Sequence, residues 1–413
     1  MTNATPEARA APSVRVLALS CLFPNAAQPN YGVFVLNRLK AVSRFCTITV
    51  VAPIHSYLLL GLTRTARMRD KAVPLREKIE GFDVHHPRFA IVPRYLKWFD
   101  ALSYWWAACK VVAGLETREG LTFDVVDVHW TYPDIAAGFW LARRRGKKLL
   151  VTVRGKEALY PGERTLRRWL LGYFLRRADA VITLSDELKD LVIELGVAPA
   201  RVRTILNGVD RGRFHSRPKN ECRKRLGLSV DRKLIISVGA LIERKGHHEL
   251  VRVMSGLSRT DAVDLCIIGG AGPEGDMTGR LNQMIAELGL TNVRLVNKVA
   301  HDALADWYGA ADLFCLATRG EGCPNVVLEA LACGTPVVST DVGAIRELVS
   351  DGENGFVIGV DRLGELEDAV RKALRWNWDR DRIAERMNAW GWPRCADEVI
   401  QTYHAVLSQE PSR

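Results

Sequence analysis

Short apolar segments rich in Val, Ile and Leu alternate with helix-length segments along the whole chain, and this alternation constrains the fold more than any other feature. Strands separated by helices pair in parallel, and runs that are apolar throughout indicate strands covered on both faces. The segments fall into two sets, 14–19, 47–52, 124–128, 148–153 and 180–184, then 234–238, 264–268, 293–295, 313–316 and 336–340. Two such sets predict two Rossmann-like domains of the α/β class.

The length of the chain fits two such domains, because 413 residues exceed what one compact core usually holds. An apolar run ends at Asn207-Gly208-Val209-Asp210, where Asn-Gly is typical of a turn, and a charged segment follows. We therefore predict a first domain over 1–208 and a second over 209–390. The tail over 381–407 has a helical pattern that is broken at Gly391-Trp392-Pro393.

Composition excludes several classes of protein. The chain is 48% hydrophobic and 25% charged, which excludes a disordered or fibrous chain. No apolar run reaches the roughly 18–20 residues that cross a bilayer, and the polar start MTNATPEARAAP lacks the pattern of a signal peptide. The nine cysteines form no CxxC pair, which is typical of reduced thiols. We expect a cytoplasmic protein.

Positive charge is concentrated in one part of the chain. The formal net charge is +11, and the segment 139–178 alone carries twelve basic and two acidic residues, a net charge of +10. Such a segment fits an anionic partner, either nucleic acid, a phospholipid surface or a phosphorylated substrate. A solvated basic face is the alternative interpretation.

Two glutamates in the stretch 318–349 carry the strongest chemical signal. Glu321 lies in a Gly-rich loop, and Glu329 lies in a short helix that Asn325 can start and Gly334 can stop. Pro324 at the junction fits the preference of proline for the first helical turn. The N-terminus of a helix after such a loop presents free amides to an anion. A carboxylate one turn into the helix can accept both hydroxyls of a ribose, while the loop carboxylate faces a sugar.

The stretch 318–349 resembles the E-x7-E signature of the family 4 glycosyltransferases, and further motifs extend the resemblance over most of the chain. These are Phe23-Pro24 with Tyr31-Gly32-Val33-Phe34-Val35, Val128-His129-Trp130-Thr131-Tyr132-Pro133-Asp134, Asn207-Gly208-Val209-Asp210, Val238-Gly239-Ala240-Leu241 with Glu243-Arg244-Lys245-Gly246, Ile267-Ile268-Gly269-Gly270 with Gly272-Pro273, and Ala311-Asp312-Leu313-Phe314. The run that contains His129 is similar to the variant found in exopolysaccharide and teichuronic-acid-type transferases. The order of the motifs is the one expected for the family.

The resemblance implies a GT-B architecture, in which two Rossmann-like domains face each other across a cleft. The last helix, over 391–413, would cross back to the first domain. The resemblance also implies transfer of a sugar from a UDP- or GDP-linked donor, with retention of configuration and without a metal ion or other cofactor. The implied acceptor is a saccharide or a lipid-linked sugar in polysaccharide biosynthesis.

The resemblance assigns roles to particular residues. Glu321 would hydrogen-bond the donor sugar, and Glu329 would hydrogen-bond the ribose. Arg244 and Lys245 would meet the leaving diphosphate, because a metal-free enzyme needs fixed cations and amides there. A double displacement through Glu321 is the alternative to a front-face reaction. The catalytic set is His129, Glu321, Arg244 and Lys245, and the donor-binding set is Gly32, Gly239, Arg244, Lys245, Val299, Glu321, Cys323, Pro324, Asn325, Val326 and Glu329.

Two positions depart from the family's pattern. Ala240 stands where the family commonly has an arginine after the glycine of its diphosphate strand, which leaves the phosphate charge to Arg244 and Lys245. Lys298 stands where a glycine is usual. The backbone at Lys298 and Val299 is expected to read the base.

Two residues of the first half follow predicted strands. His129 lies at the carboxyl end of its strand, where α/β sheets bind ligands, and by the resemblance it would face the donor sugar. Arg154 follows the next strand, and two interpretations stay open: it meets a phosphate of the acceptor or donor, or it is a solvent-facing arginine at a strand end. No Asp-x-Asp pair stands out, and we interpret His85-His86 and His247-His248 as surface pairs, so no metal site is predicted.

The segment 163–177, ERTLRRWLLGYFLRR, indicates a basic amphipathic helix with aromatic residues, which is typical of an interfacial membrane anchor. Its apolar positions at helical spacing are Leu166, Trp169, Leu170, Tyr173 and Phe174. A second aromatic and basic stretch covers 88–110. We expect attachment to an anionic membrane surface at the inner face of the cell membrane. The alternative is that the apolar stripe is the core face of a Rossmann helix.

Two other functions stay open at this point. A nucleotide-sugar 2-epimerase of the same fold would use the same nucleotide cleft without an acceptor. A non-catalytic nucleic-acid-binding protein would use the +10 segment. The chain has no RRM, KH or helix-turn-helix pattern, so we expect no nucleic-acid partner.

Overall fold

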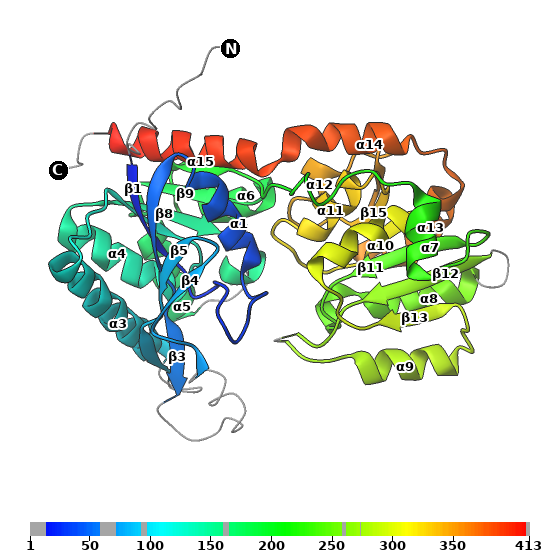
Figure 1. Ribbon diagram of the computed structural model, residues 1–413, viewed down its shortest axis with the longest axis horizontal. Coiled ribbons are helices and arrows are strands. Elements are labelled where there is room, and N and C mark those ends of the chain that lie inside the picture. Colours follow the sequence, from blue (N-terminus) through cyan, green and yellow to red (C-terminus); the bar gives the residue numbers. More distant parts are fainter. Residues whose placement is uncertain are drawn as a thin grey trace, which may run out of the picture.

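The computed structural model describes residues 14–57, 72–91, 97–159, 165–257, 262–272 and 274–409, and Figure 1 shows that they form two lobes. Several residues singled out from the sequence lie outside these ranges, among them Glu163, Arg164 and Pro273. Each lobe is built on a mainly parallel sheet, as the alternation of apolar segments predicts.

The described strands of the first lobe form an eight-stranded sheet in which only β4 and β5 pair antiparallel. In spatial order the strands are β10 (Val202–Thr204), β9 (Ala180–Thr183), β8 (Lys148–Val153), β7 (Val125–Val128), β1 (Val14–Leu19), β2 (Cys46–Val51), β5 (Phe82–His85) and β4 (Arg76–Ile79). A separate parallel pair, β3 (Ile54–Tyr57) and β6 (Arg88–Ile91), lies beside α3 (Lys97–Arg118).

The described strands of the second lobe form a six-stranded sheet that is parallel throughout. In spatial order they are β13 (Val293–Val296), β12 (Val263–Ile268), β11 (Lys233–Val238), β14 (Leu313–Leu316), β15 (Val337–Thr340) and β16 (Gly355–Ile358). From β11 the chain first adds β12 and β13 on one side and then β14, β15 and β16 on the other. Where the strand order reverses in this way, the carboxyl ends of the strands leave a crevice that can bind a ligand.

Helices connect these strands. In the first lobe, besides α3, they are α1 (Val33–Val42), α4 (Asp134–Arg145), α5 (Leu166–Leu175) and α6 (Asp186–Glu194). In the second lobe they are α7 (Lys219–Leu226), α8 (His247–Leu257), α9 (Thr278–Glu287), α10 (Leu304–Ala310), α11 (Asn325–Ala332), α12 (Ile345–Leu348), α13 (Leu366–Arg375) and α14 (Arg380–Arg386). Among the helices of the described residues, none combines the length and the apolar character needed to cross a bilayer.

The last helix, α15 (Trp392–Leu407), returns to the first lobe and packs against α1, along the top of Figure 1. Its buried residues Cys395, Val399 and Tyr403 join Val14 and Leu150 in one apolar cluster on that face of the first sheet. A second cluster on the other face contains residues of α3 and α4. The predicted GT-B arrangement and the returning helix are therefore confirmed.

All ten strands predicted from the apolar runs are present, with bounds within one residue of those expected. The division of the chain at residue 208 stays a prediction; the last strand of the first sheet ends at Thr204, and the first strand of the second begins at Lys233. The strands β3, β4, β5, β6, β10 and β16 were not predicted, because each has only three or four residues and most mix polar with apolar side chains.

Candidate active site

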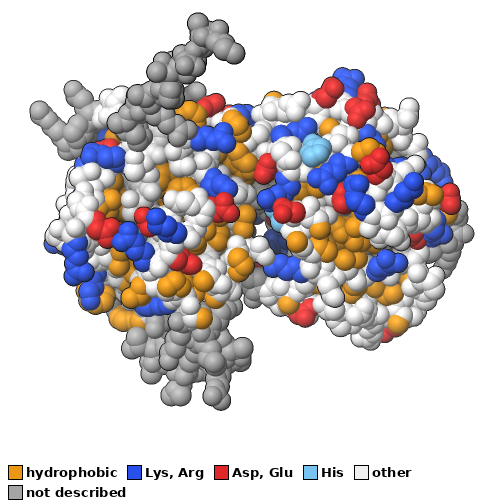
Figure 2. Space-filling view, in the orientation of Figure 1, with side chains coloured by type: hydrophobic (Ala, Val, Ile, Leu, Met, Phe, Trp, Pro, Cys, Tyr) orange, Lys and Arg blue, Asp and Glu red, His pale blue; other side chains and the backbone are white. Residues whose placement is uncertain are grey.

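A cavity of about 390 Å³ lies between the two lobes, and Figure 2 shows the surface hollowed where the lobes meet. Val33 and Phe34 of α1 line it from the first lobe, and Asp210 and Phe214 line it from the segment that connects the lobes. Trp392 at the start of α15 also lines it. The cavity is therefore built by both lobes, the connecting segment and the returning helix.

The second lobe contributes the carboxyl ends of its central strands to this cavity. Four of the predicted donor-binding residues line it, namely Gly239, Val299, Asn325 and Glu329. Lys298, the departure from the family's pattern, lines it as well. Because parallel sheets bind ligands at this edge, the cavity is where the resemblance leads us to expect a nucleotide.

Glu329 lies on α11 and is held by two hydrogen-bond donors. Tyr308 Oη donates to Glu329 Oε2 at 2.9 Å, and His301 Nε2 lies 2.9 Å from Oε1. The side chain of Glu329 is 10% exposed. Asn325, the first residue of the helix, receives a hydrogen bond from Asn207 across the lobes at 2.9 Å. The helix begins at Asn325 and is followed by Gly334 with a positive φ of 73°, as predicted, but Pro324 occupies the N-cap position and does not lie in the first helical turn.

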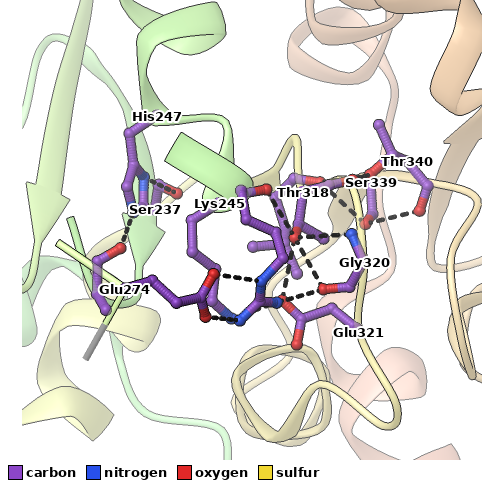
Figure 3. Close-up of polar contacts among 12 residues, drawn as sticks. Ser237, Lys245, His247, Glu274, Thr318, Gly320, Glu321, Ser339 and Thr340 are labelled. Atoms are coloured by element: carbon purple, nitrogen blue, oxygen red, sulfur yellow. Dashed lines mark hydrogen bonds and ion pairs between the residues drawn. The ribbon is translucent and has the colours of Figure 1, made fainter. Parts of the chain in front are cut away.

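Glu321 is paired with a predicted phosphate-binding cation. Lys245 Nζ donates to Glu321 Oε1 at 2.5 Å, and Thr318 Oγ1 donates to the same oxygen at 3.1 Å (Figure 3). The Lys245 side chain is 16% exposed and that of Glu321 is 12% exposed. Neither residue lines the cavity itself. The structure thus brings together Glu321 and Lys245, which the resemblance assigns to the sugar and the diphosphate.

Arg244 is paired with a carboxylate that sequence reasoning did not single out. Its guanidinium donates to both oxygens of Glu274, at 2.6 and 3.1 Å, and to the carbonyl of Gly320 at 2.5 Å. Hydrogen bonding to Arg244 lowers the pKa of Glu274. Arg244 also lies 3.8 Å from Glu321 Oε1. In this conformation the predicted diphosphate cations are neutralised by protein carboxylates (Figure 3).

His129 follows β7 as predicted, but its side chain is fully buried and does not line the cavity. Arg154 Nη2 donates to its Nδ1 at 2.9 Å, which leaves the ring proton on Nε2, 3.3 Å from Asp127 Oδ2. Burial lowers the pKa of His129, and Asp127 opposes that shift. Tyr403 of α15 donates to the same Asp127 oxygen at 2.5 Å. The structure therefore does not place His129 facing the cleft, because Arg154 and Asp127 enclose it.

Arg154 is a buried residue, 6% exposed, so the interpretation of it as a solvent-facing arginine is wrong. Besides the His129 ring, its guanidinium bonds the His129 carbonyl at 3.1 Å, approaches Asn207 Oδ1 at 3.5 Å and lies over the ring of Phe34. Burial lowers its pKa well below the ordinary value. Its own carbonyl is so close to Gly322 that a Cβ there would come within 1.8 Å. Arg154 therefore lies where the two lobes meet.

The remaining predicted donor-binding residues shape the backbone around the cavity. Gly32 caps α1 with φ 68°, and a Cβ at this position would lie 2.4 Å from the carbonyl oxygen of Leu22. Cys323 is buried, which raises the pKa of its thiol to about 12, and Pro324 precedes α11. Val326 packs against the apolar core. None of these four lines the cavity.

The interpretation of the histidine pairs as surface residues is wrong, because His85, His86, His247 and His248 are all buried. His247 begins α8, where its ring nitrogens lie 3.2 Å from Ser237 Oγ and 3.2 Å from the Ala240 carbonyl. Burial lowers its pKa to about 4. In the part of the chain that the structure describes, no three His, Cys, Asp or Glu side chains are grouped to hold a metal ion.

Sequence reasoning missed several residues of this region, namely Asp127, Arg213, Glu274, His301, Tyr308 and Tyr403. Each is an isolated polar residue in the sequence, and no second polar residue lies near it at a spacing that is typical of a known motif. Asp127 carried one signal, because it is a carboxylate inside an otherwise apolar strand, and a buried charge requires partners.

Both halves of the chain match models of glycosyltransferase families. Residues 66–213 match the model described as Glycosyltransferase Family 4, and residues 218–390 match Glycosyl transferases group 1. Neither the epimerase nor the nucleic-acid-binding alternative finds support in these matches.

Relatives over most of the chain are glycosyltransferases by name. A protein named "Putative teichuronic acid biosynthesis glycosyltransferase TuaC" from Bacillus subtilis is 28% identical over 95% of this chain and 94% of its own. A D-inositol 3-phosphate glycosyltransferase of Xylanimonas cellulosilytica is 31% identical over 74% of this chain and 78% of its own.

Solved structures share the fold. A sucrose-phosphate synthase from Thermosynechococcus elongatus superposes with a TM-score of 0.76 at 19% identity, over 95% of this chain and 99% of its own. Anabaena HepE, solved in complex with UDP and glucose, superposes with a TM-score of 0.68 at 18% identity, over 95% and 100%. Two family models in succession, relatives along most of the length and a shared two-lobed fold lead to one conclusion: the chain belongs to the family 4 glycosyltransferases of the GT-B fold.

Proposed function

We propose that this glycosyltransferase takes a sugar from a UDP- or GDP-linked donor, binds the nucleotide in the cavity between the lobes, and works in polysaccharide biosynthesis. The observation that carries the proposal is Glu329, a carboxylate at the cavity wall that accepts one hydrogen bond from His301 and one from Tyr308. Such a carboxylate keeps lone pairs for the hydroxyls of a ribose. The complex of Anabaena HepE with UDP and the polysaccharide name of the Bacillus relative support it.

Lys245 and Arg244 are proposed to bind the donor diphosphate. Because both cations already pair with carboxylates, donor binding would exchange Glu321 and Glu274 for phosphate oxygens. Glu321 would then be released toward the donor sugar. The charge that develops on the leaving phosphate would be met by these cations, so we propose a metal-independent reaction. We further propose retention of configuration by a front-face route, as the family resemblance implies.

His129 is proposed to act on the donor sugar only after a local change. Its Nδ1 accepts from Arg154 and its Nε2 faces Asp127, so a sugar hydroxyl has no ring nitrogen available in this conformation. Movement of Arg154 toward a phosphate would free Nδ1. One movement of Arg154 would therefore allow both contacts expected from the sequence, that of Arg154 with a phosphate and that of His129 with the donor sugar.

The test is a screen of UDP- and GDP-sugars for donor hydrolysis, followed by transfer to a saccharide acceptor. We expect release of nucleotide from one donor class, unchanged turnover in EDTA, and a product whose anomeric proton coupling shows the donor's configuration. Loss of turnover in EDTA that Mg²⁺ restores would overturn the metal-independent proposal. An inverted product would overturn retention. Nucleotide stabilisation in a thermal shift experiment that survives high salt separates the enzyme from a nucleic-acid binder.

The acceptor is proposed to be a saccharide or a lipid-linked sugar, with the protein at the cytoplasmic face of an anionic membrane. Three neighbouring helices of the first lobe, α3, α4 and α5, expose large apolar side chains: Leu102, Trp106, Trp140, Leu166 and Trp169, each 47–64% exposed. Exposed Lys110, Arg143, Arg144, Arg176 and Arg177 belong to the same helices or directly follow α5. A basic surface with exposed aromatic residues fits an anionic lipid interface.

The structure also bears on the alternative interpretation of the 163–177 stripe. Leu171, Phe174 and Leu175 of α5 are buried, whereas Leu166 and Trp169 are exposed. The helix therefore has a core face as well as an exposed apolar edge. Trp169 stacks on Tyr173 at that edge, with ring centroids 5.9 Å apart.

A further inference from the structure

The carboxylate of Glu329 is oriented by residues that no sequence motif singles out. Both of its oxygens are engaged, Oε1 by His301 Nε2 and Oε2 by Tyr308 Oη, each at 2.9 Å. A hydrogen bond to each oxygen restricts the rotation of a carboxylate about its terminal bond. Tyr308 is fully buried, and the His301 side chain is 35% exposed at the cavity.

The tautomer of His301 is set by Arg213. Arg213 Nη1 lies 2.6 Å from His301 Nδ1, and a guanidinium can only donate. Nδ1 must therefore carry the lone pair, and the ring proton lies on Nε2, where it is donated to Glu329. Arg213 is itself held by Asp302, whose Oδ1 lies 2.8 Å from Arg213 Nε.

The aromatic ring of Phe214 packs against both donors. Its centroid lies 5.2 Å from that of His301 and 5.9 Å from that of Tyr308, both in edge-to-face geometry. Phe214 is 1% exposed. Arg213 and Phe214 are neighbours in the segment that connects the two sheets, so this segment holds both groups that orient Glu329.

We propose that Arg213, Phe214, His301 and Tyr308 are positioning residues that orient Glu329 for the two hydroxyls of the donor ribose. The inference rests on the proposed function, because it takes Glu329 as the ribose-binding carboxylate. Each oxygen accepts one of these two bonds and keeps a further lone pair that can accept a ribose hydroxyl at the cavity.

The test compares the affinities of protein variants for nucleotide variants in a double-mutant cycle, measured by titration calorimetry. The ligands are UDP and GDP with their 2′-deoxy and 3′-deoxy forms, and the variants are His301→Phe and Tyr308→Phe, which keep the ring and remove the donor. Wild type should bind the ribonucleotide about tenfold or more tightly than at least one deoxy form. Each variant should bind the ribonucleotide about tenfold more weakly, and its preference over the deoxy form should fall toward one.

Two controls accompany this cycle. His301→Gln keeps an N–H donor that can reach Glu329 and should restore most of the ribose preference. Tyr403→Phe also removes a buried hydroxyl bonded to a carboxylate, that of Asp127, but neither residue lines the cavity, so this variant should leave both nucleotide affinities unchanged.

The outcomes distinguish a failure of the positioning role from a failure of the proposed function on which it rests. Equal weakening of ribonucleotide and deoxynucleotide in both variants, or no weakening at all, overturns the positioning role while nucleotide binding stands. Failure of wild type to bind UDP or GDP overturns the proposed function itself. If His301→Phe retains the ribose preference and Tyr308→Phe loses it, then His301 and Arg213 are not positioning residues.

Discussion

Glu329, His301 and Lys298 of the second lobe border an open cavity, whereas Asp127, His129 and Arg154 of the first lobe enclose one another and are at most 6% exposed. The second lobe presents polar groups that can meet a ligand as they stand. The first lobe holds its polar groups in bonds that a ligand would have to exchange. The comparison teaches that the groups bordering the cavity can be reached directly, whereas the enclosed groups of the first lobe can be reached only after a rearrangement.

The cations of the two lobes differ in the same way. Lys245 and Arg244 are partly exposed, with 16% and 29% of their side chains accessible, and pair with carboxylates that can be displaced by phosphate. Arg38 and Arg154 are buried, and burial lowers the pKa of Arg154. A phosphate that replaces the carboxylate still gives Lys245 or Arg244 an anionic partner, whereas a buried charge that loses its partner is costly. Changes to Lys245 and Arg244 should therefore act mainly on activity, whereas changes to the buried polar groups of the first lobe should also lower stability.

The largest effect is expected from Lys245→Ala and Arg244→Ala. Each should lower kcat/KM by about 10²–10³-fold, because fixed cations stabilise the charge of the leaving diphosphate. Thermal stability should change little, since both residues lie in the short 3₁₀ segment Glu243–Lys245 outside the core. Steady-state kinetics and thermal melts of both variants measure this, with Arg362→Ala, an exposed arginine of the same lobe, as the control. Wild-type turnover of the double alanine variant would end this assignment.

The first lobe should respond through stability, and Asp134 provides the sharpest case. This carboxyl begins α4 in a fully buried site beside the Cys21 amide, and burial raises its pKa from 3.8 to about 7. Between these values the folded state binds the extra proton. The free energy of unfolding should therefore fall as pH rises from about 4 to about 7, by on the order of 3 kcal/mol from this group.

Urea unfolding at several pH values measures this slope. Asp134→Asn cannot titrate, so its free energy of unfolding should lack the fall that this one carboxyl contributes between about pH 4 and pH 7. Asp190→Asn, an exposed aspartate on α6, should keep the wild-type slope. Identical slopes in wild type and Asp134→Asn would contradict the enclosed character of the first lobe's polar groups.

Much of the fold was predictable, for a physical reason. Strands such as 148–153 and 313–316 are covered on both faces, so they are apolar at nearly every position. Such strands can be recognised in the sequence as short apolar runs. Strands β4 (Arg76–Ile79) and β5 (Phe82–His85) are short and carry charged residues, so no run marks them.

The candidate site could be predicted only where its residues lie close together in the sequence and form a motif. Glu321 and Glu329 lie eight residues apart, and their loop and helix could be interpreted from the intervening residues. His301 and Tyr308 reach Glu329 from 28 and 21 residues away, and Tyr403 reaches Asp127 from 276 residues away. Contacts of that range depend on how whole helices pack. The histidine pairs were misjudged for the same reason, since polar partners for His247 come from Ser237 and Ala240 only after folding.

A smaller and more selective effect is expected from the two glutamates. Glu329→Gln should weaken UDP or GDP binding about tenfold with little change in kcat, because a ribose contact is made equally in the ground and transition states. Glu321→Gln should chiefly lower kcat, since contacts to the reacting sugar tighten as charge develops. Calorimetry and steady-state kinetics on both variants separate the two effects. Nucleotide affinity that fell only in the Glu321 variant would reverse the roles.

The smallest effect concerns α3, α4 and α5 of the first lobe, whose exposed side chains are both basic and aromatic. We expect the protein to sediment with vesicles that contain anionic lipid and to be partly released by high salt, because salt screens the basic residues but not apolar insertion. Arg167 lies over the ring of Tyr132 and Arg168 bonds the Leu159 carbonyl, so Arg143 and Arg144 at the exposed end of α4 test the charge more cleanly.

The charge variant Arg143→Glu/Arg144→Glu should lower vesicle binding several-fold at low salt and have little further effect at high salt. The apolar variant Trp140→Ser/Trp169→Ser should instead lower the fraction that stays bound at high salt. Each basic residue near an anionic surface contributes about 1 kcal/mol, which is why the charge variant has the larger effect. If both variants sediment like the parent, these helices do not meet lipid, and a soluble phosphorylated acceptor becomes the better partner for the basic face.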